Sequence, residues 1–114
     1  MFDVQRTAGK VAELCRSFGC DEVVEGIGRT GVVVVIKGRN SASGRVIGLR
    51  ADMDALPIIE QTGLAYASQT HGKMHACGHD THVAYLVGVA QALNAMRDNW
   101  SGTVVLIGQP AEEI

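Results

Sequence analysis

The sequence has few aromatic side chains, few cysteines and no long apolar run. Aromatic residues make up 4% of the 114 residues while hydrophobic residues make up 46%, so the predicted core is aliphatic. The three cysteines are an odd and sparse set, which favours a reducing compartment over a disulfide framework. No apolar run approaches the roughly 18–20 residues that a membrane-spanning helix requires.

An excess of positive charge is also lacking. The formal net charge is −2, which gives no electrostatic reason to expect nucleic acid or an anionic membrane as a partner. Residues 1–6 do not show the charged and then apolar order of a signal peptide. We therefore expect a cytoplasmic protein whose partners include neither nucleic acid nor membrane.

Two apolar stripes at helical spacing predict two amphipathic helices. The first stripe consists of Val4, Ala8, Val11, Cys15 and Phe18. Its helix is expected to end at Gly19, a residue suited to the left-handed stop. The second stripe consists of Val83, Leu86, Val87, Ala90 and Leu93 and predicts a helix over 80–97. We interpret this second stripe as a core face, not as a membrane or partner face.

The segments rich in β-branched residues predict strands. Residues 32–36 and 45–50 flank a stretch with turn chemistry, so they are expected to form a hairpin. Residues 103–107 predict a further buried strand, while 51–70 reads as an irregular and unusually long loop. The order of helix, strands, helix and strand predicts an α/β fold, with helices packed on a mixed β-sheet.

The stretch "MHACGHDTH" at 74–82 concentrates side chains that bind borderline metals such as zinc. Cys77 and His79 are two residues apart, so they converge only if the backbone is irregular, which Gly78 permits. Asp80 or Thr81 is suited to cap the helix that follows. The alternative interpretation is a small buried thiol and a histidine that serves only the fold.

Two acidic pairs follow predicted strands. Asp52 and Asp54 come just after one strand, and Glu112 and Glu113 come just after another. Ligands bind at the carboxyl ends of strands in α/β sheets, so these pairs and the Cys/His turn are expected to share one edge. Glu112 and Glu113 can divide the roles of metal ligand and proton acceptor. The alternatives are a turn or cap for the first pair and a solvated acidic end for the second.

The other histidines and cysteines carry weaker signals. His75 is expected to shape the turn before Cys77, and His82 is expected in the first helical turn, facing substrate; neither is predicted as a ligand. His71 is interpreted as a loop histidine. Cys15 lies on the apolar stripe and is expected in the core, and Cys20 is interpreted as having no role.

Three motifs in order carry a family resemblance. They are "GLRADMDALP" (48–57), "GKMHACGHDTH" (72–82) and "GQPAEE" (108–113), and "DEVVEGIGRTGVV" (21–33) adds to them. Together they resemble the amidohydrolase branch of the aminoacylase and carboxypeptidase metallopeptidases. That branch includes hippurate hydrolases, N-acyl-amino-acid amidohydrolases and plant auxin-conjugate hydrolases. The resemblance extends over essentially all of the chain.

The resemblance implies a centre of two divalent metal ions, with zinc, manganese, cobalt or nickel as candidates. Cys77 would be the bridging thiolate, with His79 and Glu113 as further ligands. Glu112 would be the general base for a metal-held water that attacks the amide carbonyl.

A further group of side chains would contact the metal ligands and orient them without binding the ions. This supporting group comprises Asp52, Asp54, His75 and His82.

The implied reaction is hydrolysis of the amide bond of N-acyl or N-aroyl amino acids, small-molecule substrates, by a parent enzyme that is a homo-oligomer. Two alternatives stay open. One is a metal-binding but catalytically incomplete fragment, and the other is a thiol redox protein that uses Cys77, although no C-x-x-C motif supports it.

The chain also departs from complete family members. They are several times longer, begin with an additional helix that carries a His-Pro-Glu segment, and continue into a lid or dimerisation domain and further ligand histidines. Many have glycine where this chain has Ile114. We expect residues 1–114 to be the amino-terminal part of an incomplete, zinc-peptidase-like catalytic domain, inactive alone. The strand over 103–107 is expected to keep an unprotected edge or apolar face.

Overall fold

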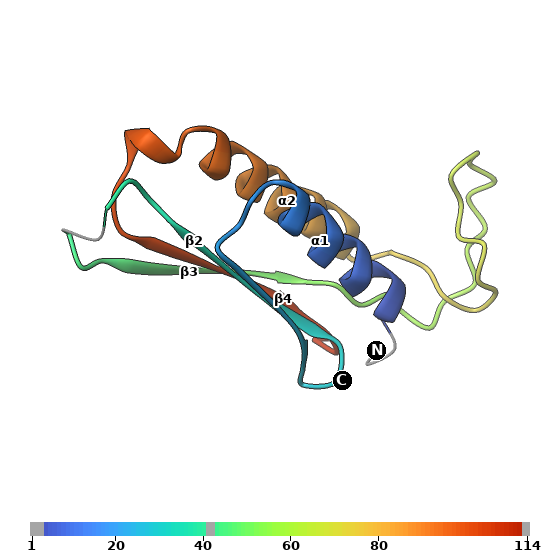
Figure 1. Cartoon of the computed structure of the whole chain (residues 1–114). Coiled ribbons are helices and arrows are strands. Elements are labelled where there is room, and N and C mark those ends of the chain that lie inside the picture. Colours follow the sequence, from blue (N-terminus) through green and yellow to red (C-terminus); the bar gives the residue numbers. More distant parts are fainter. Residues whose placement is uncertain (1–3, 41–42, 113–114) are drawn as a thin grey trace.

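The computed structural model describes residues 4–40 and 43–112, which form two helices packed on one face of a four-stranded sheet (Figure 1). The helices are α1 (Gln5–Ser17) and α2 (His79–Ala95), and a short 3₁₀ helix, η1 (Arg97–Asn99), follows α2. The strands are β1 (Glu22–Ile27), β2 (Gly31–Lys37), β3 (Val46–Asp52) and β4 (Thr103–Gln109). The predicted mixed α/β fold is confirmed.

The strand order in the sheet is β1-β2-β4-β3. β1 pairs with β2 and β2 with β4 in antiparallel fashion, whereas β3 and β4 are parallel. The predicted hairpin of residues 32–50 is therefore wrong, because β4 lies between its two strands. Strands rich in β-branched residues and of similar length can pair with several other strands, and the apolar pattern alone does not determine which pairing forms.

β4 occupies an interior position, so of the two alternatives expected for residues 103–107 the unprotected edge is wrong, whereas the exposed apolar face is present at Ile107. The side chain of Leu106 is fully buried in this strand. β3 and β1 form the edges instead. The parallel pairing aligns Asp52 of β3 with Gln109 of β4, so both strands end at the same edge of the sheet.

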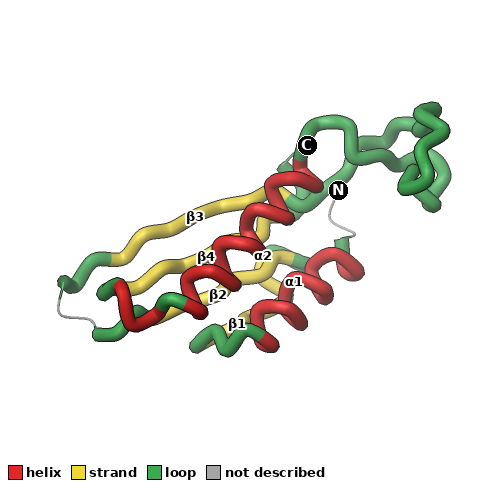
Figure 2. The backbone as a smooth tube through the Cα atoms, turned by 90° about the horizontal axis from the view of Figure 1, so that it is seen from above, coloured by secondary structure: helices red, strands yellow, loops and turns green. Residues whose placement is uncertain are grey.

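The two helices lie side by side over the sheet, as the view from above shows (Figure 2). α1 buries Ala8, Val11, Ala12 and Cys15, and α2 buries Leu86 and Ala90. Val32, Val34 and Ile36 face them from β2. The core is aliphatic, as the composition predicts, and both predicted stripes face it. Burial of these side chains is the main force that holds the helices on the sheet.

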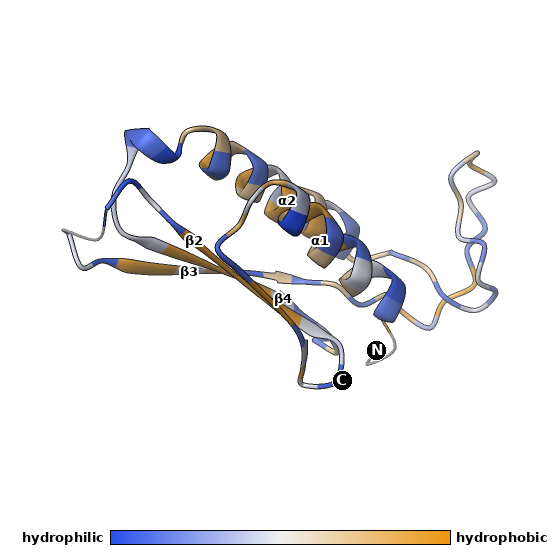
Figure 3. Ribbon diagram, viewed as in Figure 1, coloured by the Kyte–Doolittle hydropathy of each residue, from blue (hydrophilic) through white to orange (hydrophobic). Residues whose placement is uncertain are grey.

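Within residues 4–40 and 43–112, no helix covers the opposite face of the sheet. Figure 3 shows apolar residues continuing along the strands. The strand register places the exposed side chains of Val24, Ile27, Val46 and Ile107 on this face. Ile47 and Leu49 of the edge strand β3 are also exposed, but they pair with Val104 and Leu106 and so lie on the helix side. An apolar sheet surface of this kind is a site for association with other protein surfaces.

The segment between β3 and α2 has no regular structure apart from a bridge between Leu56 and Met74. The main-chain N–H of each donates to the other's carbonyl, at 2.9 and 3.0 Å. Residues 57–73 form an arm that projects from the sheet and helices (Figure 1). The bridge between Leu56 and Met74 thus closes the base of the long loop that the sequence predicts. Neither α1 nor α2 is long and apolar enough to cross a membrane.

Candidate metal centre

The ends of β3 and β4 place acidic side chains at one edge of the sheet. The N–H of Met53 donates to the carbonyl of Gln109 at 2.8 Å, which continues the ladder one step beyond Asp52. After Pro110, Ala111 adopts a left-handed conformation with φ of +57°. This conformation is costly for a residue with a Cβ, and it turns the chain so that Glu112 lies beside the end of β3.

The amino terminus of α2 brings His79 to the same edge. The bridge at the base of the arm holds residues 74–79 next to the residues that follow β3. Gly78 stands at the helix start with φ of +89°, the irregular backbone that the sequence predicts there. The predicted side-chain cap is wrong, because α2 has no side-chain cap hydrogen bond. Thr81 instead donates its hydroxyl to the carbonyl of Gly78 at 2.6 Å.

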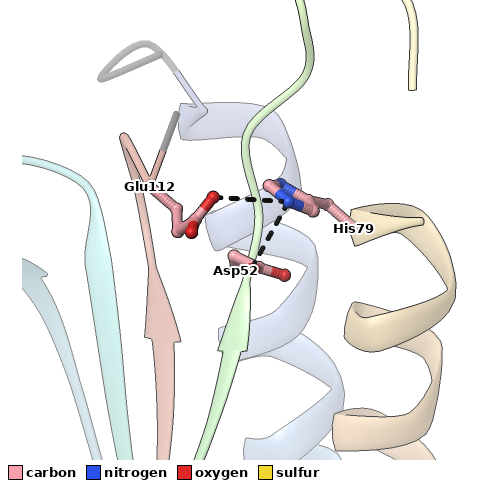
Figure 4. Close-up of side chains that lie close together, drawn as sticks. All are labelled: Asp52, His79 and Glu112. Carbon is pink, nitrogen blue, oxygen red and sulfur yellow. Dashed lines mark ion pairs between the residues drawn. The ribbon is translucent and has the colours of Figure 1, made fainter. Parts of the chain in front are cut away.

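Asp52, His79 and Glu112 form a cluster whose ligand atoms all lie within 4.8 Å of one another (Figure 4). Nε2 of His79 is 3.4 Å from Oδ2 of Asp52 and 3.7 Å from Oε2 of Glu112. Two donor atoms bound to one zinc ion at bond lengths of about 2.1 Å and a tetrahedral angle are about 3.4 Å apart. The spacing and the donor types therefore fit a divalent cation.

Asp54 holds the other side of the His79 ring. Nδ1 of His79 lies 3.0 Å from both Oδ1 and the main-chain oxygen of Asp54. Both residues are buried, with side chains 4% and 0% exposed. Nδ1 therefore carries the proton and donates a hydrogen bond to Asp54, while Nε2 faces Asp52 and Glu112. This carboxylate–histidine arrangement is the usual support of a metal-binding histidine.

The titration of the cluster reflects these contacts. Burial alone would lower the pKa of His79, but the charge of Asp52 and the hydrogen bonds to Asp54 outweigh it and hold the pKa above its ordinary value. Burial alone would raise the pKa of Asp52, but the hydrogen bond to His82 and the charge of His79 outweigh it and keep the pKa low. Without a metal ion, Asp52 and His79 thus favour a carboxylate–imidazolium pair.

His82 makes a contact with Asp52 that the sequence does not reveal. Its Nδ1 lies 2.6 Å from Oδ1 of Asp52, and its ring stacks on that of His79 with centroids 5.8 Å apart. The spacing of three residues on a helix places the two histidines on one face, which is the only sequence signal for the pair. Asp52, predicted as a supporting residue, lies in the ligand cluster itself and is shared by both rings.

The remaining predicted site residues have different positions. Cys77 is exposed and, within the part of the chain that the structure describes, does not join the cluster of three. His75 is exposed and lines a separate polar cavity at the base of the arm, along with Met74 and Asp80. Glu113, predicted as a ligand, lies outside the described residues. The ligand roles of Cys77 and Glu113 stay predictions.

The cysteine predictions from the helix pattern can also be compared with the structure. None of the three cysteines, all of which lie within the described residues, forms a disulfide bond. Cys15 is fully buried in the core, as its place on the apolar stripe predicts. Cys20 is half-buried, and its Sγ accepts a hydrogen bond from Nδ2 of Asn94 at 3.1 Å, so it ties the end of α1 to α2.

Residues 48–114, which include both acidic pairs and the Cys/His turn, match the model of the family described as peptidase family M20/M25/M40. The chain belongs to this family. Among curated M20 relatives, it is 57% identical over 86 residues to N-acetylcysteine deacetylase of Bacillus subtilis, covering 75% of the chain and 22% of that protein. It is 50% identical over 112 residues to hippurate hydrolase of Campylobacter jejuni, covering 98% of the chain and 28% of that protein.

A solved M20 structure has the same fold. The Bacillus subtilis YXEP protein, described as a dinuclear metal-binding peptidase from the M20 family, matches with a TM-score of 0.90 and 46% identity. The match covers 99% of this chain and 31% of that one. The chain thus spans less than a third of the length of these relatives. The family resemblance that the motifs predict is confirmed.

Proposed function

We propose that this chain is the amino-terminal part of the catalytic domain of a metal-dependent hydrolase that cleaves the amide bond of N-acyl or N-aroyl amino acids. The observation that carries the proposal is the Asp52–His79–Glu112 cluster, in which Nδ1 of His79 contacts Asp54. Similarity to a hippurate hydrolase and to an N-acetylcysteine deacetylase supports the substrate class.

Nitrogen and oxygen donors in this cluster suit zinc, manganese, cobalt or nickel. We propose that Nε2 of His79 binds such an ion and that Oδ2 of Asp52 faces it. Cys77 and Glu113 complete the proposed ligand set for two ions, as the family resemblance implies. When bound, such ions polarise a carbonyl oxygen and lower the pKa of water.

We propose that Glu112 is the general base, and two observations support this role. Its side chain is 37% exposed, whereas those of His79 and Asp52 are buried, so it has access to solvent that the other two lack. Its Oε2 lies close to Nε2 of His79, at the edge of the space that the cluster surrounds. A carboxylate there is placed to take a proton from water and later to give it to the departing amine.

The test combines metal content with turnover. A longer protein that contains this segment is purified, stripped with a chelator and reloaded with zinc, manganese, cobalt or nickel. Hydrolysis of hippurate and of acetyl-amino acids should disappear on stripping and return on reloading. Turnover that survives complete removal of metal would contradict the proposal and would favour the thiol interpretation based on Cys77.

A second candidate function is a metal-binding segment with no activity of its own. The described residues bring together one cluster of three potential ligand groups, and one of these, Glu112, is proposed as the base, whereas a pair of ions needs about three protein ligands for each. We therefore expect residues 1–114 alone to bind metal without hydrolysing either substrate. Turnover by the isolated chain near that of a full-length relative would contradict this expectation. The cytoplasmic location and the homo-oligomeric state of a longer parent stay predictions.

A further inference from the structure

His82 and Asp52 form a short contact beside the candidate metal centre. Nδ1 of His82 is 2.6 Å from Oδ1 of Asp52, while Oδ2 of the same carboxylate is 3.4 Å from Nε2 of His79. One oxygen of Asp52 is thus occupied by His82, and the other faces the proposed metal space. The side chain of Asp52 is 8% exposed and that of His82 is 48% exposed.

Without such a partner, the Asp52 carboxylate has rotational freedom. The last side-chain torsion of aspartate is broad and roughly two-fold, so either oxygen can point toward His79 at little cost. A hydrogen bond from His82 to Oδ1 removes that freedom and presents Oδ2 alone. The His82 ring itself stacks on the ring of His79, with centroids 5.8 Å apart.

We infer that His82 is a positioning residue of the metal centre, which orients Asp52 toward the ion through Nδ1 and does not bind the ion itself. This inference rests on the proposed function, because it requires a metal at the cluster. A histidine that only formed a surface ion pair would contribute a little to folding stability and would not change metal affinity. The two roles are therefore separable by experiment.

The test uses two amides that place their nitrogen differently. The side-chain nitrogen of asparagine overlaps Nδ1 of histidine, whereas that of glutamine reaches the place of Nε2. Metal affinity is measured by calorimetry for His82→Asn, His82→Gln and His82→Leu, in this chain or in a longer protein that contains it. Urea unfolding of the metal-free proteins is measured in parallel. His71→Leu, in the exposed loop, is the matched control.

We expect His82→Leu and His82→Gln to lose about tenfold or more in metal affinity, and His82→Asn to stay within about threefold of the parent. Equal losses for asparagine and glutamine, or no loss for leucine in a folded protein, would overturn the inference. If the leucine variant fails to fold, the comparison of asparagine with glutamine decides. Absence of metal binding by the unsubstituted protein would overturn the proposed function, and the inference with it.

Discussion

Nδ1 of His79 lies 3.0 Å from Oδ1 of Asp54, although the two residues are 25 positions apart in the chain. The link joins the amino terminus of α2 to the segment that follows β3. It is buried on both sides, so water does not compete for it. The ring orientation of His79, and therefore the direction of Nε2, depends on this contact.

Replacing Asp54 with alanine should weaken metal binding by about 10–100-fold, because His79 loses the partner that orients its ring. Asp54→Asn keeps an acceptor oxygen and should lose less. Calorimetric titration with zinc measures both. Asp98→Ala, an exposed substitution in η1, serves as the control and should leave affinity unchanged. Full affinity in folded Asp54→Ala would show that the contact does not orient the ligand.

In a longer active protein, Glu112→Gln should keep its metal and lose about 10²–10⁴-fold in turnover, because an amide does not accept the proton. Cys77→Ala should lose metal as well as turnover, since the family resemblance makes the thiolate a bridging ligand. Metal analysis by mass spectrometry and steady-state kinetics separate the two effects. Equal metal loss in both variants would show that the two roles are assigned wrongly.

The Asp52–His79 pair should make the stability of the metal-free chain depend on pH. The raised pKa of His79 gives a contribution that is full below 6.5, its ordinary value, and is lost as the pH rises through the folded-state value. The lowered pKa of Asp52 gives a contribution that is full above 3.8 and is lost as the pH falls through its folded-state value. The pair therefore contributes most between these two ordinary values.

Urea unfolding with chelator, compared between the parent chain and Asp52→Asn, measures that contribution. The difference in unfolding free energy should shrink toward neutral and alkaline pH. Stabilisation by added metal should show the opposite trend and grow as the pH rises, because the metal replaces the proton on Nε2 of His79. A difference that does not vary with pH would contradict the assigned ion pair.

Gly78 and Gly88 should respond in opposite ways to alanine. Gly78 has φ of +89°, where a Cβ costs about 1–2 kcal/mol, so Gly78→Ala should destabilise the fold and displace His79. Gly88 lies within α2 with no neighbouring atom within 4 Å of an added Cβ, so Gly88→Ala should stabilise by about 0.5–1 kcal/mol. Chemical denaturation gives both values. Stabilisation by Gly78→Ala would mean that the turn differs from the one described.

Alkylation should distinguish the cysteines. Burial, reinforced by the neighbouring Cys20, raises the pKa of Cys15 to about 12, so its thiol should not react with iodoacetamide at mildly alkaline pH until the chain unfolds. Cys77 is exposed and should react first. Bound metal should slow the labelling of Cys77, if it is a ligand, and leave that of Cys20 unchanged. Peptide mapping by mass spectrometry reads each site separately.

The pattern of residues predicts most helices and strands, because interactions between residues close in the sequence govern where they form. The apolar stripes locate both helices to within about two residues, since each stripe has to face a core. The β-branched runs locate β2 and β4 for a similar reason. The local pattern does not predict which strands pair with one another, because pairing joins segments far apart in the sequence and several strands have similar edges. The insertion of β4 between β2 and β3 is therefore absent from the local pattern.

The sequence by itself determined that Asp52, Asp54, His79 and Glu112 belong to one edge, because each follows a strand or starts a helix there. Only the tertiary structure decided how they share the space. Asp54 holds Nδ1 of His79, while Asp52 is divided between His79 and His82. These assignments depend on ångström-scale distances between segments up to 30 residues apart. Residue types and spacing do not predict these distances. They are set by the parallel alignment of β3 with β4 and by the bridge that closes the base of the arm.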